Sequence, residues 1–76
     1  MLAKINKVTI RGDYITLGQF LKLTGIIGYG GEEKAFLATN DVLVNDEKEI
    51  RRGKKLRNGD HVTVLGQLYQ ICSSES

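Results

Sequence analysis

The residues whose chemistry most clearly suggests a function form a run of positive charge in the second half of the chain. Six of the 11 lysine and arginine residues lie between Lys48 and Arg57, and Glu49 is the one acidic residue among them. The remaining 66 residues hold five basic and eight acidic side chains. The net charge of +2 therefore hides a strongly basic lobe on a slightly acidic body, a distribution typical of proteins that bind a polyanion.

The sequence also indicates how this charge is presented. Gly53 divides the run into an arginine pair, residues 51–52, and a lysine pair, residues 54–55. A glycine allows a sharp turn, so both pairs are expected around one bend. Composition alone leaves two interpretations open, a binding surface and a solvated loop. The bend favours binding, and so does the arginine pair, because guanidinium groups make planar, bidentate contacts with phosphate.

The other reactive side chains do not form a catalytic or metal site. The single histidine, His61, follows Asp60 in a predicted strand, and an exposed imidazole beside a turn acid explains it better than a general base. The single cysteine, Cys72, has no adjacent base to activate it and no second thiol for a disulfide or a closed zinc site. We therefore expect a non-enzymatic protein with no metal, no cofactor and no small-molecule substrate.

The glycine-rich segment does not match a phosphate loop. Glycines stand at positions 25, 28, 30 and 31, but position 33 is Glu, so the G-x-G-x-x-G pattern fails. Glu32 and Glu33 would also repel a phosphate at the helix that follows. These glycines are expected to provide turn geometry.

Length and composition predict one small soluble domain. A chain of 76 residues buries only a thin core. Lys4 and Lys7 interrupt the apolar start, and no stretch approaches the length of a membrane span. Together with the single cysteine, this predicts a cytoplasmic protein without a membrane partner. We expect a domain over residues 1–72 and a flexible tail over residues 73–76.

Periodicity predicts a strand and two helices in the first half. Alternating β-branched residues indicate a strand from Lys4 to Ile10. Thr16 and Gln19 form a capping box for a short helix that ends at Gly25. A second helix carries Glu32 and Glu33 in its first turn and is expected to end at a left-handed Asn40. The predicted core contacts between the helices and the connector involve Leu17, Phe20, Leu21, Phe36, Leu37 and either Ile26 or Ile27.

After residue 42 the apolar period changes to two, which is typical of strands. Val42 and Val44 alternate before a turn at residues 45–46, and Val62 and Val64 alternate after a turn at residues 58–60. A hairpin through residues 66–67 leads to a last strand, residues 68–71. The predicted class is α+β, with two short packed helices followed by a small antiparallel sheet of three or four strands.

This order of elements resembles the S4 domain, a small RNA-binding module of a ribosomal protein, of some pseudouridine synthases and of some tyrosyl-tRNA synthetases. The resemblance covers about residues 15–65 and rests on "TLGQFLKLTG", "GGEEKAFL", "VLVND" and "RRGKKLRNGDHV". The chain looks most like the small stand-alone bacterial members called YaaA. The resemblance implies that the two helices and the basic turn form an L-shaped surface, the αL motif, for structured RNA.

Carried over by position, the resemblance assigns RNA contacts to the two helices and to the basic turn. The sequence departs from the family at residues 29–30, where many members have Ser-Arg, at Glu33, where a small residue is common, and at Asp46, where glycine is usual. These departures favour the basic turn over the helices as the contact surface. Tyr29 is open to two interpretations, a packed loop residue or a platform for an unpaired base. The predicted RNA-binding residues are Lys22, Lys34, Arg51, Arg52, Lys54, Lys55 and Arg57.

The leading hypothesis is a non-enzymatic protein that binds structured RNA, with ribosomal RNA as the class that the resemblance implies. Two alternatives remain open from the residues alone. The basic loop would also suit an acidic protein partner in an interaction or regulatory module, or the backbone of duplex DNA.

Overall fold

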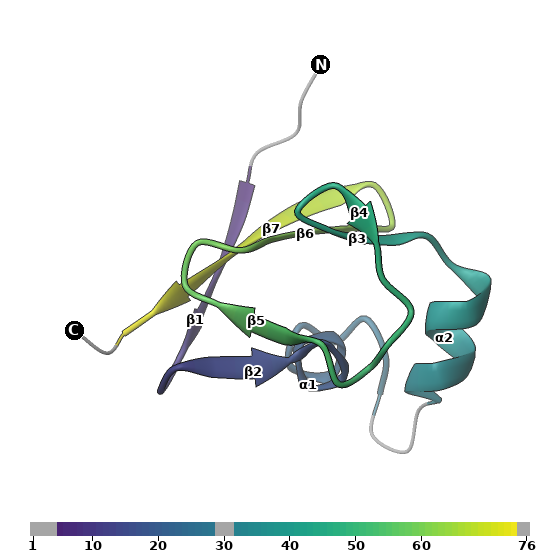
Figure 1. Cartoon of the computed structure of the whole chain (residues 1–76), viewed down its shortest axis with the longest axis horizontal. Coiled ribbons are helices and arrows are strands. Elements are labelled where there is room, and N and C mark those ends of the chain that lie inside the picture. The colour runs from purple at the N-terminus through teal and green to yellow at the C-terminus, as the bar shows by residue number, and fades with distance from the viewer. Residues whose placement is uncertain (1–4, 29–31, 75–76) are drawn as a thin grey trace.

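The computed structural model describes residues 5–28 and 32–74 and has the predicted α+β architecture, in which helices and a small second sheet pack against a mixed main sheet (Figure 1). None of the described helices is long and apolar enough to cross a membrane. In chain order the elements are β1 (Ile5–Ile10), β2 (Tyr14–Thr16), α1 (Leu17–Leu23), α2 (Glu33–Thr39), β3 (Val42–Val44), β4 (Glu47–Lys48), β5 (Lys55–Arg57), β6 (His61–Val64) and β7 (Gln67–Ser73).

The main sheet has five strands in the order β1-β7-β6-β3-β4. The strands that follow the helices pair antiparallel, as predicted, and Val42 and Val44 lie opposite Val64 and Val62. All four valines are buried, so the two valine alternations form the inner face of the sheet. The first strand, β1, adds to this sheet by pairing in parallel with the last strand, β7. The strand predicted from Lys4 to Ile10 is thus confirmed over its described residues.

A second sheet of two strands, β2 and β5, was not predicted. The strands are antiparallel, with Tyr14 opposite Arg57 and Thr16 opposite Lys55. Each strand has three residues, which is too short for alternation to identify it in the sequence. In β5 the side chain of Leu56 is fully buried between two exposed basic residues. This sheet therefore holds the end of the basic run against the body of the domain.

Helix α1 begins and ends as the sequence predicts. The Gln19 backbone N–H donates to Thr16 Oγ1 at 3.2 Å, and the Thr16 N–H donates to Gln19 Oε1 at 2.9 Å, which completes the capping box. Gly25 follows the helix with a φ of +80°, a left-handed conformation that glycine adopts readily.

The predicted end of α2 is wrong in its geometry. Asn40 is extended, with φ −124° and ψ 150°, instead of left-handed. Its side-chain Nδ2 donates to the Phe36 carbonyl oxygen at 3.1 Å, and its backbone N–H donates to the same oxygen. The side chain thus caps the helix while the backbone already points into β3, which starts two residues later.

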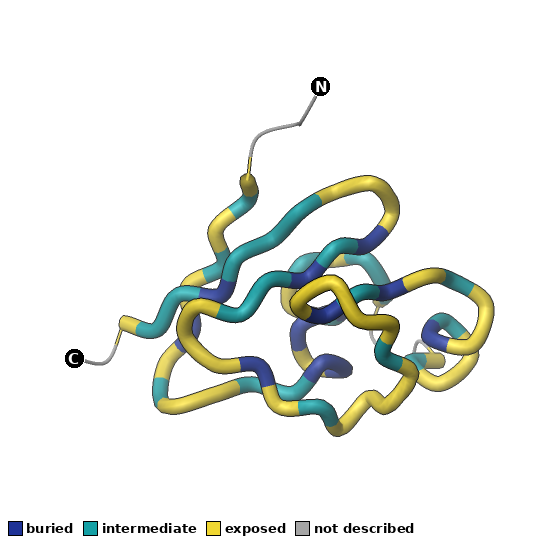
Figure 2. The backbone as a smooth tube through the Cα atoms, turned by 45° about the horizontal axis from the view of Figure 1, so that its top comes forward, coloured by how far each residue is buried: buried dark blue, intermediate teal, exposed yellow. Residues whose placement is uncertain are grey.

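The core lies between α1, the main sheet and β5 (Figure 2). The predicted contacts are confirmed in outline, because Leu37 is buried and Phe36, Ile26 and Ile27 pack partly buried against the core. No polar or charged side chain is buried within the described ranges. The fully buried side chains are Leu17, Phe20, Leu21, Leu37, Val42, Leu56, Val62, Val64 and Ile71.

The last hairpin turns one residue earlier than predicted. Leu65 and Gly66 form the turn, with φ values of +51° and +73°, because Val64 pairs directly with Gln67. Two consecutive left-handed residues are typical of a hairpin turn whose twist matches that of the strands. The strand that follows, β7, runs through Ser73, one residue beyond the predicted domain boundary. The Ser74 N–H also donates to the Ile10 carbonyl oxygen at 3.0 Å.

We expect Leu56→Ala to lower the free energy of unfolding by about 2 to 5 kcal/mol, because it removes a fully buried side chain from a small core. Urea denaturation followed by circular dichroism measures this. Leu23→Ala is the matched control, since that side chain is 59% exposed, and its effect should stay within about 0.5 kcal/mol. Equal losses in the two variants would contradict the role of Leu56.

We expect Leu65→Asn to raise the free energy of unfolding by up to about 1 kcal/mol, because asparagine tolerates the left-handed backbone better than leucine. The leucine side chain is 59% exposed, so little packing is lost. Leu65→Ala keeps the strained Cβ and should give no gain. Thermal unfolding of the three proteins compares them, and a gain in the alanine variant would argue against backbone strain.

Candidate functional site

The basic run is positioned by hydrogen bonds between its backbone and the start of α1. The Leu17 N–H donates to the Lys54 carbonyl oxygen at 2.8 Å, and the Gly18 N–H donates to the Arg52 carbonyl oxygen at 2.9 Å. The first N–H groups of a helix have no partner within the helix. The loop therefore supplies the acceptors that α1 lacks, and the helix fixes the loop.

The far end of the run is held by Asp60. One carboxylate oxygen, Oδ2, accepts a hydrogen bond from the Arg57 backbone N–H at 2.8 Å. The other oxygen accepts from Asn45 Nδ2 at 3.2 Å. These bonds join the end of β5 to the β3–β4 turn, so the segment from Arg52 to Arg57 is anchored at both ends.

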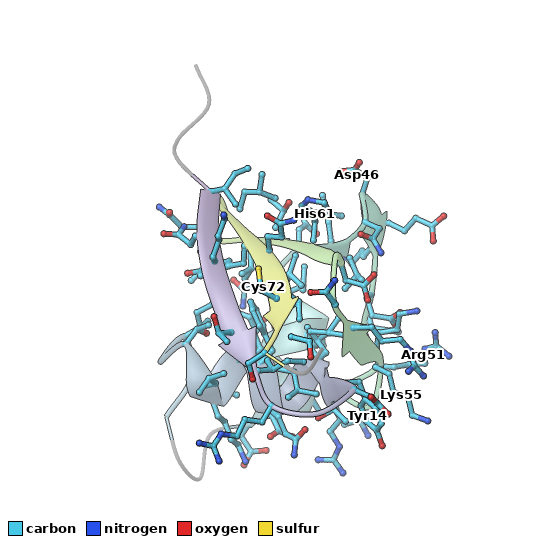
Figure 3. All side chains as sticks on the ribbon, turned by 90° about the vertical axis from the view of Figure 1, so that its left-hand side faces the viewer. Tyr14, Asp46, Arg51, Lys55, His61 and Cys72 are labelled. Atoms are coloured by element: carbon cyan, nitrogen blue, oxygen red, sulfur yellow. The ribbon has the colours of Figure 1, made fainter. Side chains whose placement is uncertain are left out.

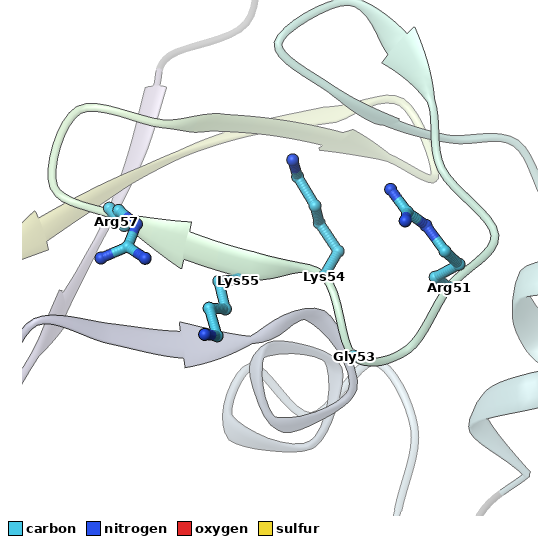
Figure 4. Close-up of a pocket in the computed structure, with 5 residues that line it drawn as sticks. All are labelled: Arg51, Gly53, Lys54, Lys55 and Arg57. Carbon is cyan, nitrogen blue, oxygen red and sulfur yellow. The ribbon is translucent and has the colours of Figure 1, made fainter.

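Four cationic side chains surround one open pocket of about 570 Å³, which we call the basic pocket (Figure 4). Gly53 lies at the bend of the loop, as predicted. Arg51 and Lys54 extend to the same side of the loop, whereas Lys55 extends from the other side of β5 toward β2. The lining residues are Arg51, Gly53, Lys54, Lys55 and Arg57.

A second pocket of about 350 Å³ adjoins the first and shares Arg51 and Gly53 with it. Its lining adds Lys34 from α2, together with Arg52 and Ile50. The structure thus brings one predicted helix residue, Lys34, to the basic run.

Tyr14 belongs to this site and was missed in the sequence. The Lys55 Nζ atom lies 5.0 Å from the centre of the Tyr14 ring, and the Arg57 Cζ atom lies 5.4 Å from it. Figure 3 shows Tyr14, Lys55 and Arg51 at the same end of the molecule. Cations are attracted to the face of an aromatic ring, so Tyr14 orients two of the predicted site residues. Tyr14 is the first residue of the three-residue strand β2, and only the pairing of this strand with β5 reveals its role.

Glu49 neutralises Arg51. Its Oε2 atom accepts hydrogen bonds from Arg51 Nε at 3.0 Å and from the Arg51 backbone N–H at 3.0 Å. The side-chain hydrogen bond from Arg51 lowers the pKa of the Glu49 carboxyl from 4.5 to about 2, against a smaller opposing effect of burial. The same contact raises the pKa of the Arg51 guanidinium. Arg51 therefore lies at the pocket with its charge already compensated.

Glu33 engages two further predicted site residues. Its Oε2 lies 2.9 Å from Lys22 Nζ, and its Oε1 lies 3.6 Å from Arg52 Nη1. The ion pair with Lys22 lowers the pKa of the Glu33 carboxyl below its ordinary value. Lys22 also lines a separate hollow with Ile15, Gln19 and Leu23, away from the basic pocket. The structure therefore does not bring Lys22 to the pocket.

The remaining predicted cations carry uncompensated charge. Lys34, Lys54, Lys55 and Arg57 form no ion pair with any carboxylate in residues 5–28 and 32–74. Tyr29, for which two interpretations were open, lies outside the described residues. Among the predicted site residues, the lysine pair, Arg57 and Lys34 therefore carry the positive charge that no described carboxylate compensates.

His61 and Cys72 lie apart from this surface. Figure 3 shows His61 near Asp46, at the opposite end of the molecule from Tyr14 and Lys55. Both side chains are half-buried, and Cys72 carries a free thiol. In the part of the chain that the structure describes, no three His, Cys, Asp or Glu residues are grouped so as to hold a metal ion.

We expect the Glu49 contact to stabilise the fold in a pH-dependent way. Because the pKa is lower in the folded than in the unfolded chain, the ionised carboxylate stabilises the fold above about pH 4.5, and this stabilisation is lost as the pH falls toward 2. The difference in unfolding free energy between the wild type and Glu49→Gln should therefore shrink over that range.

Urea denaturation at several pH values measures that difference. Glu47→Gln is the matched control, because it makes the same change of charge at an exposed side chain that forms no ion pair within the described residues. A pH-independent difference for Glu49→Gln would show that its ion pair with Arg51 does not stabilise the fold.

Comparison with known proteins identifies the family of the chain. The chain is 52% identical over 61 residues to a protein of Bacillus subtilis (strain 168) named probable ribosome maturation protein RlbA, and the match covers 80% of this chain and 86% of the relative. No solved structure matches the chain. The family model of the S4 domain matches residues 8–72, which include both helices and every strand from β3 to β6. The chain therefore belongs to the S4 domain family.

Proposed function

We propose that this domain is a non-enzymatic protein that binds structured RNA, and ribosomal RNA in particular, through the basic pocket. The observation that carries the proposal is that Lys54, Lys55 and Arg57 line one pocket and have no carboxylate partner in the described chain. Uncompensated cations that converge on an open surface attract phosphate groups and release the counterions bound to them.

The chemistry of the pocket favours contacts with the RNA backbone. Among the described residues, its lining consists of four cationic side chains and Gly53, and the Tyr14 ring lies beside Lys55 and Arg57. Phosphate contacts set the position and orientation of the protein and read no sequence. Recognition therefore depends on the shape of a folded RNA, whose phosphates must reach the basic pocket and the adjoining second pocket together.

The family and the relative support ribosomal RNA as the ligand. The S4 domain is an RNA-binding module in the family resemblance described above, and the Bacillus subtilis relative is named a probable ribosome maturation protein. The match covers 86% of that relative and 80% of this chain, which supports the same role for this chain. The proposal accordingly includes a cytoplasmic location, where ribosomes mature.

We expect binding to ribosomal RNA to weaken steeply with salt. If about four phosphates are neutralised, the logarithm of the affinity should fall with the logarithm of the salt concentration at a slope of about −3 to −4. Filter binding or fluorescence anisotropy across salt concentrations measures the slope. A flat response would overturn the proposal. So would equal or tighter binding to duplex DNA or to an acidic protein of similar charge.

We expect Lys54→Ala/Lys55→Ala to reduce the affinity for ribosomal RNA about tenfold or more and to make the salt slope shallower by about 1.4 to 1.8, because two phosphate contacts are lost. Lys7→Ala/Lys48→Ala is the matched control. It removes the same charge from β1 and β4, the two edge strands of the main sheet, away from both pockets.

A third variant, Arg51→Ala/Arg52→Ala, should have a smaller effect than the lysine double variant, because both arginines already bind carboxylates. Circular dichroism confirms that each variant is folded. A lysine variant that binds as tightly as the edge-strand control would exclude the basic pocket as the RNA site.

A further inference from the structure

Glu33 lies where three parts of the fold meet. It comes from the first turn of α2 and contacts Lys22 of α1 at 2.9 Å and Arg52 of the basic loop at 3.6 Å. Its side chain is only 15% exposed, whereas those of Lys22 and Arg52 are 35% and 68% exposed. The carboxylate is thus enclosed, and the two cations remain open to solvent on their outer sides.

The Glu33 carboxylate lies close to the backbone of α1 at Gly18. A Cβ atom at Gly18 would lie 3.0 Å from Glu33 Cδ and 3.1 Å from Oε1. Glycine at this position of α1 therefore lets the carboxylate approach the helix backbone closely. The two carboxylate oxygens divide between the two cations, in the way that two oxygens of a phosphate divide between a lysine and an arginine.

This arrangement has a direct effect on the second pocket. Arg52 lines that pocket beside Lys34, so Glu33 cancels positive charge at its edge. An RNA phosphate that approached Lys22 and Arg52 would meet a negative charge already bound between them. Partly exposed ion pairs of this kind contribute little to stability, so the main effect of Glu33 is on the electrostatics of the surface.

We infer that Glu33 fills an anion site formed by Lys22 and Arg52 with its own carboxylate, and thereby excludes an RNA phosphate from the junction of α1, α2 and the basic loop. The inference rests on the proposed function for the identity of the excluded ligand. It assigns Glu33 as a residue that restricts where RNA binds, so that phosphate contacts are confined to the basic pocket and to Lys34.

The test compares Glu33→Gln with Glu32→Gln. Both variants remove one negative charge at the start of α2, but Glu32 is exposed and forms no ion pair within the described residues. Glu33→Gln should steepen the salt slope for ribosomal RNA by about 1 to 2 and raise the affinity about tenfold at 0.1 M salt, because two cations become available. Glu32→Gln should leave the slope unchanged.

A double-mutant cycle identifies the cations involved. The change of slope caused by Glu33→Gln should disappear when Lys22→Ala and Arg52→Ala are also present. A merely structural role for Glu33 would alter the melting temperature of these variants but not the salt slope. The inference is overturned if Glu33→Gln and Glu32→Gln bind alike, or if the gain persists without the two cations.

A measurement on the wild type covers the case in which Glu33→Gln does not fold. In NMR spectra of the lysine Cε and Nζ groups, ribosomal RNA should shift the signals of Lys54 and Lys55 and leave that of Lys22 in place. A shift of Lys22 as large as that of Lys54 would overturn the inference.

Inorganic polyphosphate, used as a second probe, separates this inference from the proposed function. Absence of ribosomal RNA binding by the wild type would refute the proposed function. The inference about Glu33 then stands if Glu33→Gln gains affinity for polyphosphate over Glu32→Gln, and fails if it does not.

Discussion

The fold of the site depends on two hydrogen bonds that join segments far apart in the sequence. The buried N–H groups of Leu17 and Gly18, at the start of α1, donate to carbonyl oxygens of Lys54 and Arg52. Helix N–H groups left without acceptors in a dry environment would be costly. The loop is thus part of the helix terminus. These bonds hold the backbone of the charged segment against the helix, and most of its basic side chains are exposed to solvent.

The net positive charge at the surface of the basic run is smaller than the number of its basic residues suggests. Within the basic run, Glu49 compensates Arg51, and from another element Glu33 reaches Arg52. The ring of Tyr14 also attracts Lys55 and Arg57, the two cations of β5, by cation–π interactions. The effective positive surface is therefore narrower than the run of basic residues and is centred on Lys54, Lys55 and Arg57.

Structural features that depend on residues close together in the sequence could be predicted from the sequence. The capping box at Thr16 and the paired valine alternations depend on local spacing, and both are present. The pairing of β2 with β5 was not predictable, because each strand is three residues long and the partners are about 40 residues apart. The same holds for the approach of Glu33 to Arg52, since an ion pair between distant residues leaves no local pattern. The conformation of Asn40 was not predictable either. Its side chain caps α2, but its backbone is extended instead of left-handed.

The parallel pairing of β1 with β7 has a consequence for synthesis of the protein. β1 lies at the edge of the main sheet, and its partner there, β7, is the last strand among the described residues. As the chain leaves a ribosome, residues 5–10 have no strand to join until residues 67–73 have emerged. Contacts between such distant residues form slowly, since a long loop must close first. The main sheet therefore cannot be completed before residues 67–73 have been synthesised, and shorter nascent chains carry β1 without its partner.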